Sequence, residues 1–188
     1  MLTEQLKQIC SINKIHDPIE HEKRLNLYSP FIDSAITEFH INTPLRKAAF
    51  IAQIAHETGA FHYLREIWGP TAQQLKYDTS IRLMNQLGNK EKGDGFKFRG
   101  RGAIMITGRA NYEHFGKLLG FDLITHPEIA ESQVLAFRIA GLFWQEKGLN
   151  EMADRKEFEQ ITRRVNGGLN GQAERLSYYE KAKEVLHA

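Results

Sequence analysis

Apolar residues recur along this chain at helical spacing, in segments that turn-forming residues separate. Thr43-Pro44 provides a cap and a first-turn proline, and the apolar residues that follow repeat at intervals of three, four and seven. They are Leu45, Ala48, Ala49, Ala52 and Ala55. This spacing places them on one face, so it predicts an amphipathic helix that begins at Pro44 and ends near Gly59.

Capping residues mark the starts of other helices. Asp17-Pro18 followed by Glu20 has an N-cap, a first-turn proline and a capping-box acid in order. Thr71 with Gln74 forms a second capping box, and we expect Asp154 with Glu157 to form a third. These signals predict three helices, each beginning directly after its cap.

The last third of the chain contains the most apolar segment. Ser132–Glu146 is apolar on nearly every side and closes at Gly148, which predicts a helix at the centre of a core. Two more helices follow, the first ended by Asn166-Gly167-Gly168. Their expected inward residues are Phe158, Ile161 and Val165 in the first, and Leu176, Tyr179 and Leu186 in the second.

Residues 88–109 differ from the rest, because they hold six of the fifteen glycines and few helix signals. Within them, Gly102–Gly108 fits either a short strand or a buried loop. Long ordered loops in small domains are usually functional. With no repeat and little other strand evidence, the sequence predicts an all-α fold and a single domain over residues 1–188.

Composition narrows the class of protein without naming a function. The chain has 188 residues, 25 Lys and Arg against 23 Asp and Glu, 41% hydrophobic residues and one cysteine. These values exclude a disordered protein, a coiled coil and a disulfide scaffold. The first 17 residues contain no apolar signal-peptide region, and the longest apolar stretch is too short to span a membrane. We therefore expect a protein made in the cytoplasm and not stably inserted into a membrane.

One segment could indicate nucleic-acid binding. Phe96–Gly102 interleaves aromatic residues with cations, as single-strand grooves do. The segment occurs once, and Glu91 and Asp94 balance its charge. A loop whose glycines let the backbone approach a polymeric ligand explains it equally well. With a net charge of +2, we predict no nucleic-acid partner.

Two glutamates are the candidates for chemistry. Glu57 falls at the C-terminal end of the Pro44 helix, where the dipole disfavours an ionised carboxylate, as a general acid requires. Glu66 follows nine residues later, past a turn that can bring it back towards Glu57. Paired carboxylates carry out glycoside hydrolysis. The alternatives are an exposed glutamate at position 57 and an ion pair of Glu66 with Arg65.

His56-Glu57 also invites a comparison with zinc proteases. That motif needs a second histidine three residues after the glutamate, where this chain has Ala60, and His62 is on another helix face. The remaining histidines show no ligand spacing. We expect no metal and no organic cofactor.

Three blocks, in this order, resemble glycoside hydrolase family 19, and within it the phage and prophage endolysin branch. They are Ala55–Gly59 (AHETG), Phe98–Tyr112 (FRGRGAIMITGRANY) and Ile161–Gly171 (ITRRVNGGLNG). The resemblance runs from about residue 41 to the C-terminus. It implies a lysozyme-like, two-lobed helical domain with a catalytic cleft and no separate wall-binding module. It also implies a muramidase that hydrolyses the β-1,4 bonds of peptidoglycan with inversion and lyses the host cell.

The resemblance also implies roles for individual residues. Glu57 matches the general acid, Glu66 the base that activates water, and Thr107 the residue that helps hold this water. Met105 departs from the family's usual glutamine. The residues expected at the substrate are His56, Tyr63, Arg99, Arg101, Asn111, Tyr112, Asn166 and Arg175, of which Arg175 supports the acidic centre. Purely structural roles stay open for four residues: Thr107 as a buried hydroxyl, Tyr112 in the core, Asn166 as a helix cap and Arg175 on a solvated helix face.

The expected partners are peptidoglycan glycan strands, and the expected state is a monomer. The resemblance places synthesis in the host cytoplasm and action in the periplasm after release through a holin pore. Two alternatives remain: a chitinase acting on N-acetylglucosamine polymers, and a non-catalytic glycan-binding module that uses the basic loop.

Overall fold

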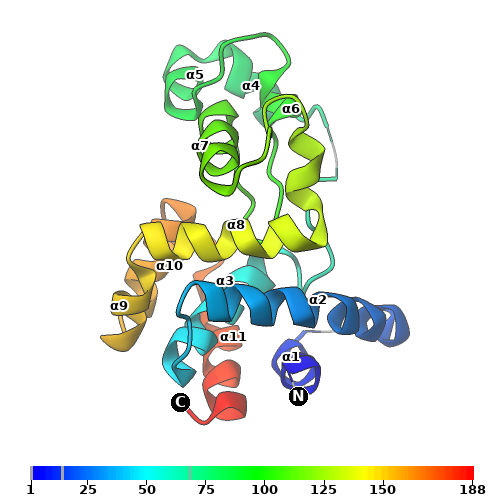
Figure 1. The fold of residues 1–188 in the computed structure, drawn as a ribbon, viewed down its shortest axis with the longest axis vertical. Coiled ribbons are helices and arrows are strands. Elements are labelled where there is room, and N and C mark those ends of the chain that lie inside the picture. Colours follow the sequence, from blue (N-terminus) through cyan, green and yellow to red (C-terminus); the bar gives the residue numbers. More distant parts are fainter. Residues whose placement is uncertain (1, 14, 68) are drawn as a thin grey trace.

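The computed structural model describes residues 2–13, 15–67 and 69–188, and this part of the chain is mainly helical (Figure 1). The elements are α1 (Leu2–Cys10), α2 (Pro18–Glu38), α3 (Pro44–Glu57), α4 (Ala72–Thr79), α5 (Ile81–Leu87), α6 (Asp94–Lys97), α7 (Arg109–Leu119), the 3-10 turn η1 (Pro127–Glu131), α8 (Gln133–Glu146), α9 (Leu149–Asp154), α10 (Phe158–Asn166) and α11 (Gln172–Leu186). Over the same residues the only β-structure is two isolated bridges, from Arg101 to Arg65 and to Ile106. The predicted all-α class is confirmed.

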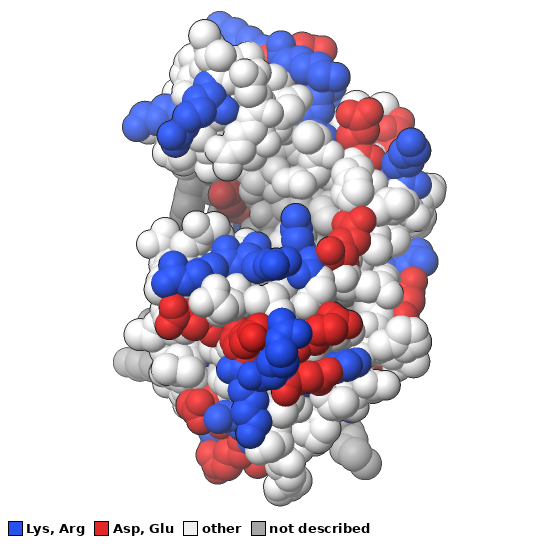
Figure 2. Space-filling model, turned by 90° about the vertical axis from the view of Figure 1, so that its left-hand side faces the viewer, with Lys and Arg blue, Asp and Glu red and all other residues white. Residues whose placement is uncertain are grey.

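The helices form two lobes. In Figure 1, α4 to α7 make an upper lobe, and α1 to α3 with α8 to α11 make a lower one. The chain crosses upward between α3 and α4, where Glu66 lies, and returns through η1. In the space-filling view the surface is hollowed where the two lobes meet, and an acidic side chain lies inside the hollow (Figure 2). The expected two-lobed arrangement is therefore present.

The Pro44 helix begins and ends as its sequence predicts. The Thr43 hydroxyl accepts a hydrogen bond from the Arg46 N–H at 3.2 Å, and Pro44 is the first helical residue. Every residue from 48 to 55 is buried. The small alanine side chains let α11 pack closely along α3, so the last helix of the chain lies beside the end of this one.

The helix predicted at the centre of the core is α8. Trp144 is fully buried and meets the Phe50 ring of α3 edge-on, with the centroids 5.3 Å apart. Its indole N–H donates to Asn150, whose amide donates to the Phe39 carbonyl. Because the Trp144 indole and the Asn150 amide both find buried partners, α8 is tied to α9 and to the end of α2.

Two expectations for the C-terminal helices are wrong. Asp154 does not cap α10: it ends a short helix, α9, that the sequence did not reveal, and it pairs with Arg46 of α3 at 2.5 Å. Leu176 is 42% exposed, and the buried side of α11 contains Arg175 and Tyr178 instead. A charged residue is expected on the outer face of an amphipathic helix, but the guanidinium of Arg175 lies on the buried face of α11.

The glycine-rich segment forms the floor of the upper lobe. Gly102–Gly108 is a buried loop: Arg101 and Ile106 exchange backbone hydrogen bonds, and Met105 has a left-handed φ of 50°. Asp94, buried in this lobe, accepts two hydrogen bonds from the Arg109 guanidinium, at 2.7 and 2.8 Å. The same carboxylate accepts the backbone N–H groups of residues 90 and 91. A single anion therefore holds both ends of the segment together.

Two further features bear on the sequence-based expectations. No helix in the described ranges combines the length and apolarity that a membrane crossing needs. Burial raises the pKa of the Cys10 thiol to about 12, so it stays protonated and unreactive at neutral pH.

We predict that Asp94→Asn lowers the free energy of unfolding by about 3 kcal/mol at pH 7, because it leaves a buried guanidinium without its counter-ion. Burial alone would raise the pKa of Asp94, but the hydrogen bonds from Arg109 and the backbone outweigh it, and the pKa is lowered. The stabilisation is therefore complete above the unfolded-state value of about 4 and disappears as the pH falls below it.

The measurement is urea unfolding of both proteins between pH 7 and pH 2.5. Glu91→Gln is the matched control. Glu91 also faces Arg109, at 3.5 Å, but its side chain is 76% exposed. This substitution should change stability by less than about 0.5 kcal/mol. A wild-type advantage over Asp94→Asn that persists undiminished at low pH would contradict the clamp.

Candidate active site

Glu57 is the last residue of α3, directly before a sharp reversal of the chain. The Thr58 hydroxyl donates to the Ile54 carbonyl at 2.6 Å and accepts from the Phe61 N–H at 2.8 Å. Gly59, Ala60 and Phe61 all have left-handed φ angles, of 58°, 56° and 64°. Such a run is unfavourable for alanine and phenylalanine and marks a turn that its surroundings enforce. The buried threonine provides that enforcement, so the Glu57 backbone is fixed from both sides.

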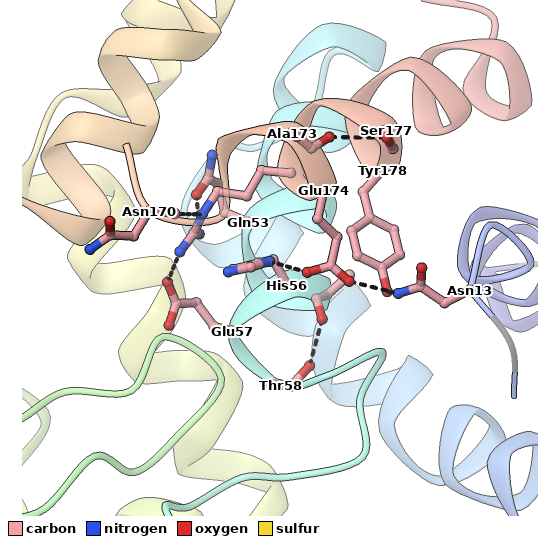
Figure 3. Close-up of polar contacts among 12 residues, drawn as sticks. Asn13, Gln53, His56, Glu57, Thr58, Asn170, Ala173, Glu174, Ser177 and Tyr178 are labelled. Atoms are coloured by element: carbon pink, nitrogen blue, oxygen red, sulfur yellow. Dashed lines mark hydrogen bonds and ion pairs between the residues drawn. The ribbon is translucent and has the colours of Figure 1, made fainter. Parts of the chain in front are cut away.

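The side chain of Glu57 is held by Arg175 of α11 (Figure 3). One terminal nitrogen of the guanidinium donates to Glu57 Oε1 at 2.5 Å. The other donates to Oε1, the side-chain amide oxygen of Gln53, at 2.6 Å. Gln53, one turn earlier on α3, donates in turn to Thr162 of α10 at 2.9 Å. Only 2% of the Arg175 side chain is exposed, against 17% for Glu57. A buried polar chain from three helices therefore ends at one partly exposed carboxylate.

This arrangement alters the electrostatic expectation for Glu57. The sequence indicated only the helix dipole at this residue, whereas the structure adds a guanidinium in direct contact with the carboxylate. The sequence-based argument left out the cation, because α11 is more than a hundred residues away along the chain. In the described part of the chain, no hydrogen bond reaches Oε2, the second oxygen of this carboxylate. That oxygen is the one able to meet a ligand.

Glu66 lies on the crossing between the lobes and is held by the glycine-rich segment. Its N–H donates to the Gly100 carbonyl at 2.9 Å, and its Oε2 accepts from the Gly100 N–H and from Gln74, at 3.3 and 2.8 Å. A Cβ on Gly100 would come within 3.2 Å of the Glu66 side chain, so only glycine fits without a shift. Both donors on this oxygen are neutral groups. Its ion pair with Arg65, the alternative, is absent among the described contacts.

Thr107 and Asn111 lie side by side at the end of the same segment. The Thr107 hydroxyl donates to the Met105 carbonyl at 3.1 Å, and the Asn111 amide donates to the Thr107 carbonyl at 2.7 Å. Thr107 is half-buried and Asn111 is exposed. The threonine hydrogen is thus committed to the backbone, which leaves the oxygen lone pairs as acceptors. Their predicted roles at the water and the substrate stay predictions.

Two of the residues expected to touch the substrate are buried, and their role is corrected. Tyr112 is fully buried; its hydroxyl donates to the Arg99 carbonyl at 2.6 Å and accepts from Arg101 at 3.0 Å. Burial raises the pKa of Tyr112 to about 12. Arg101 is only 4% exposed and also donates to the Lys97 carbonyl. Both fix the path of the glycine-rich segment.

Arg99 and Arg175 also act through the protein. Arg99 stacks on the Phe96 ring at 4.2 Å and donates to the Glu66 carbonyl, so it positions the backbone of the second glutamate. Arg175 is too deeply buried to reach a substrate directly. Its expected support of the acidic centre matches the contacts that it makes with Glu57.

Three other expected substrate residues keep some exposure. His56 is half-buried, and its Nδ1 pairs with Glu174 of α11 at 2.6 Å; Gly171 presses against its ring, where a Cβ would clash. Tyr63 is 44% exposed, beyond the turn after Glu57. Asn166 is the last residue of α10, and Gly167 is its cap. The purely structural reading of Asn166 as the cap is therefore wrong by one residue.

Sequence reasoning missed Gln53 and Glu174, which orient Arg175 and His56. Gln53 had a signal, because it is the one polar residue in the buried run of α3. Such a residue needs a buried partner. No sequence signal pointed to Glu174, since an acidic residue in the first turn of a helix is ordinarily exposed. In the described ranges no group of three or more His, Cys, Asp or Glu side chains is placed to hold a metal ion.

Comparison with known proteins places this site in a family. The glycoside hydrolase family 19 model, described as chitinase class I, matches residues 31–153. A glycosyl hydrolase family 19 domain-containing protein of Haemophilus influenzae is 36% identical over 158 residues, which are 72% of this chain and 77% of that protein. An Arabidopsis thaliana endochitinase is 34% identical over 139 residues, 70% of this chain but only 44% of the plant protein. The chain thus spans less than half of that plant relative.

Solved structures show the same fold. Chitinase C from Streptomyces griseus superimposes with a TM-score of 0.66 at 18% identity, over 99% of this chain and 92% of that one. The class IV chitinase from Zea mays gives a TM-score of 0.60 at 24% identity, over 97% and 90%. At these identities the likeness concerns the fold and not the substrate.

We predict that Arg175 and Glu57 are energetically coupled by about 2 kcal/mol, as expected of a charged, largely buried pair. A double-mutant cycle with Arg175→Met and Glu57→Gln, followed by urea unfolding, measures this coupling. The exposed pair of Arg163 and Glu159 on α10 provides the control cycle, expected at about 0.3–0.5 kcal/mol. Equal coupling in the two cycles would show that Arg175 does not hold Glu57.

Proposed function

Because this chain belongs to glycoside hydrolase family 19, we propose that it hydrolyses the β-1,4 glycosidic bonds of bacterial peptidoglycan, with Glu57 and Glu66 as the catalytic pair. One observation carries the assignment: the two carboxylates are fixed by different partners. Glu57 is anchored by a buried cation, and Glu66 by two neutral N–H donors of the loop and of α4. Inverting hydrolysis requires two such carboxyl groups with different tasks.

The contact with Arg175 decides where the acidic proton of Glu57 resides. A guanidinium has only donors, so a protonated Glu57 cannot place its hydrogen on Oε1. The proton must be on Oε2, the oxygen without a protein hydrogen bond. A bound glycan also removes water from this half-buried carboxyl, which favours the protonated form. Glu57 then presents a single acidic O–H to the leaving oxygen.

Glu66 and Thr107 divide the task of holding water. Ionised Glu66 keeps lone pairs on Oε1, and the Thr107 oxygen also accepts, since its hydrogen is used by Met105. A water that donates one hydrogen to each of them turns a lone pair outward to attack the anomeric carbon. Glu66 removes a proton as that bond forms, while Glu57 protonates the departing oxygen.

The charge distribution favours peptidoglycan as the polymer. Residues 72–119, the upper lobe, contain nine of the 25 Lys and Arg but four of the 23 Asp and Glu, a formal charge of +5 against −3 for the rest. Figure 2 shows basic side chains over the top of this lobe. Peptidoglycan has peptide carboxylates, whereas chitin is neutral, so a positive lobe beside the hollow suits the former. Chitin is the second candidate, since the plant relatives are named endochitinase or chitinase.

We also propose the biological setting that the endolysin resemblance suggests. The enzyme accumulates in the cytoplasm of a bacterial host, reaches the periplasm through a holin pore and lyses the cell. Co-expression with and without a holin tests this: lysis should require both proteins. Lysis by the enzyme alone would contradict dependence on a pore.

We predict that Glu57→Gln and Glu66→Gln each lower kcat on purified peptidoglycan by about a thousandfold, since each removes a proton transfer made in the transition state. Thr107→Val should cost about tenfold, because Glu66 alone still holds the water. Glu180→Gln, an exposed glutamate of α11, is the control and should retain full activity.

Mass spectrometry and NMR of the wild-type products complete this test. Inverted reducing ends are expected. Anhydro ends would show a transglycosylase, and cleavage of chitin oligomers without cleavage of peptidoglycan would replace the proposed substrate by the second candidate. A wild-type protein that binds glycan but cleaves neither polymer would show a binding module.

We predict further that salt separates the two polymers. Raising NaCl from 50 to 500 mM should increase KM for soluble peptidoglycan severalfold and leave KM for chitin oligomers unchanged, because only the charged polymer is attracted by the upper lobe. Equal responses of the two substrates would remove the charge argument.

A further inference from the structure

A separate pocket of about 360 Å³ lies beside the turn that follows Glu57. Its walls come from the junction of α1 and α2 and from the turn itself. The lining residues are Asn13, Ile15, His16, Asp17, His21, Arg24, Gly59, Ala60, His62 and Tyr63. The charged side chains in its walls are Arg24 and Asp17, and three histidines accompany them.

The pocket is connected to the candidate active site by hydrogen bonds. Asn13 in its wall donates to Glu174, and Glu174 pairs with His56, the neighbour of Glu57. Figure 3 shows these side chains in one line, from Glu57 through His56 and Glu174 to Asn13. Gly59, which lines the pocket, is two residues after Glu57, so the pocket begins where α3 ends.

The two walls of the pocket come from distant parts of the chain. Six of its ten lining residues, among them Asn13, His16 and Arg24, precede residue 31, where the family model begins. The other four lie in the turn after Glu57, inside the matched part. The N-terminal segment thus forms one wall and the turn the other.

Arg24 is the centre of this wall. Its Nη2 donates to His62 Nδ1 at 2.9 Å, and because a guanidinium can only donate, His62 must bear its own hydrogen on Nε2. The Nε of Arg24 is buried and has no hydrogen-bond partner in the described part of the chain. A fully buried Nε cannot meet a ligand in the pocket, so a bound anion has to be held by the terminal nitrogens of Arg24, whose side chain is 18% exposed, and by Nε2 of the exposed His62. Among the described contacts no hydrogen bond involves His62 Nε2.

The neighbouring acidic side chains, Asp17 and Glu20, do not supply an acceptor to this wall of the pocket. Asp17 uses its carboxylate to cap α2, accepting the Glu20 N–H at 3.0 Å. Glu20 itself is 48% exposed and stands 3.6 Å from a terminal nitrogen of Arg24, on the opposite end of the guanidinium from Nε. His21 donates through Nε2 to the Ala60 carbonyl, so its ring is committed to the turn.

We propose that the Arg24 pocket binds a carboxylate of the substrate polymer through Arg24 and His62, and so selects peptidoglycan over chitin. This inference rests on the proposed function, because only the acidic polymer offers that group. Two carboxylates of peptidoglycan share the chemistry: the acids of the stem peptide, and the lactyl group of the muramic acid wherever the peptide that is bonded to it has been removed. Both fit a guanidinium paired with an N–H donor.

The titration of His62 provides a direct signal of binding. Burial lowers the pKa of His62, and the charges of Arg24, His21 and His16 lower it further, while Glu20 opposes them. A bound carboxylate adds a negative charge beside the ring, so it must raise this pKa.

The kinetic test uses the full chain and three soluble substrates: intact uncrosslinked peptidoglycan, strands stripped of peptides by an amidase, and chitin oligomers. Arg24→Ala and His62→Ala should each raise KM about tenfold on an acidic substrate and leave kcat unchanged, the loss expected for one charge-assisted hydrogen bond. If KM rises with intact strands alone, the bound carboxylate belongs to the stem peptide. If KM rises with stripped strands alone, the bound carboxylate is that of the lactyl group. Chitin kinetics should not change.

Lys23→Ala is the matched control, because Lys23 is exposed on the same helix and has the same charge. An equal rise in KM for Lys23→Ala, or an equal loss on chitin, would overturn the carboxylate site and indicate a general charge or folding effect.

A binding measurement separates failure of this site from failure of the proposed function. The His62 ring proton is followed by NMR across pH, with N-acetylmuramic acid, a muropeptide or N-acetylglucosamine added. A rise in the pKa of His62 with either acid but not with N-acetylglucosamine supports the pocket, even if the protein cleaves no peptidoglycan. No rise with either acid overturns it.

Discussion

A guanidinium buried between α3, α10 and α11 determines how this protein presents its chemistry. Arg175 is 1% exposed and its donors reach Glu57, Gln53 and the Asn170 carbonyl. A charge in that position is tolerated only when every donor is satisfied. The requirement fixes the ends of three helices relative to one another. It also fixes one oxygen of Glu57, so the other must be the one that handles a proton.

The second glutamate is held by a different principle. Glu66 lies between the lobes and relies on backbone donors, a close-packed glycine and the capping glutamine of α4. The Asp94 clamp in turn holds the glycine-rich segment that supplies those donors. The upper lobe therefore combines three tasks: it orients one carboxylate, it places the Thr107 oxygen, and it carries a net positive charge.

The N-terminal segment is tied into this arrangement. Asn13 meets Glu174 and the Tyr178 hydroxyl, so the N-terminal segment is attached to the same α11 that carries Arg175. A pocket built on that attachment can recognise a substituent of the polymer while α3 and the upper lobe act on its backbone. Catalysis and selection would thus lie on opposite sides of His56.

The sequence by itself determined the local features. The caps at Asp17, Thr43 and Thr71, the core helix at 133–146 and the all-α class all follow from spacing and capping, which act within one or two turns. It also singled out Glu57 and Glu66 as the acidic candidates. It could not decide which polar residues turn inward, because burial of a charge depends on partners far along the chain.

Only the tertiary structure decided these long-range matters. It placed Arg175 inside where periodicity expected Leu176, and it made Tyr112 and Arg101 supports of a loop and not substrate contacts. The physical reason is the same in each case. A buried charge or hydroxyl is stable only with complete hydrogen bonding, and those partners meet only when α3, α10, α11 and the glycine-rich segment are brought together in space.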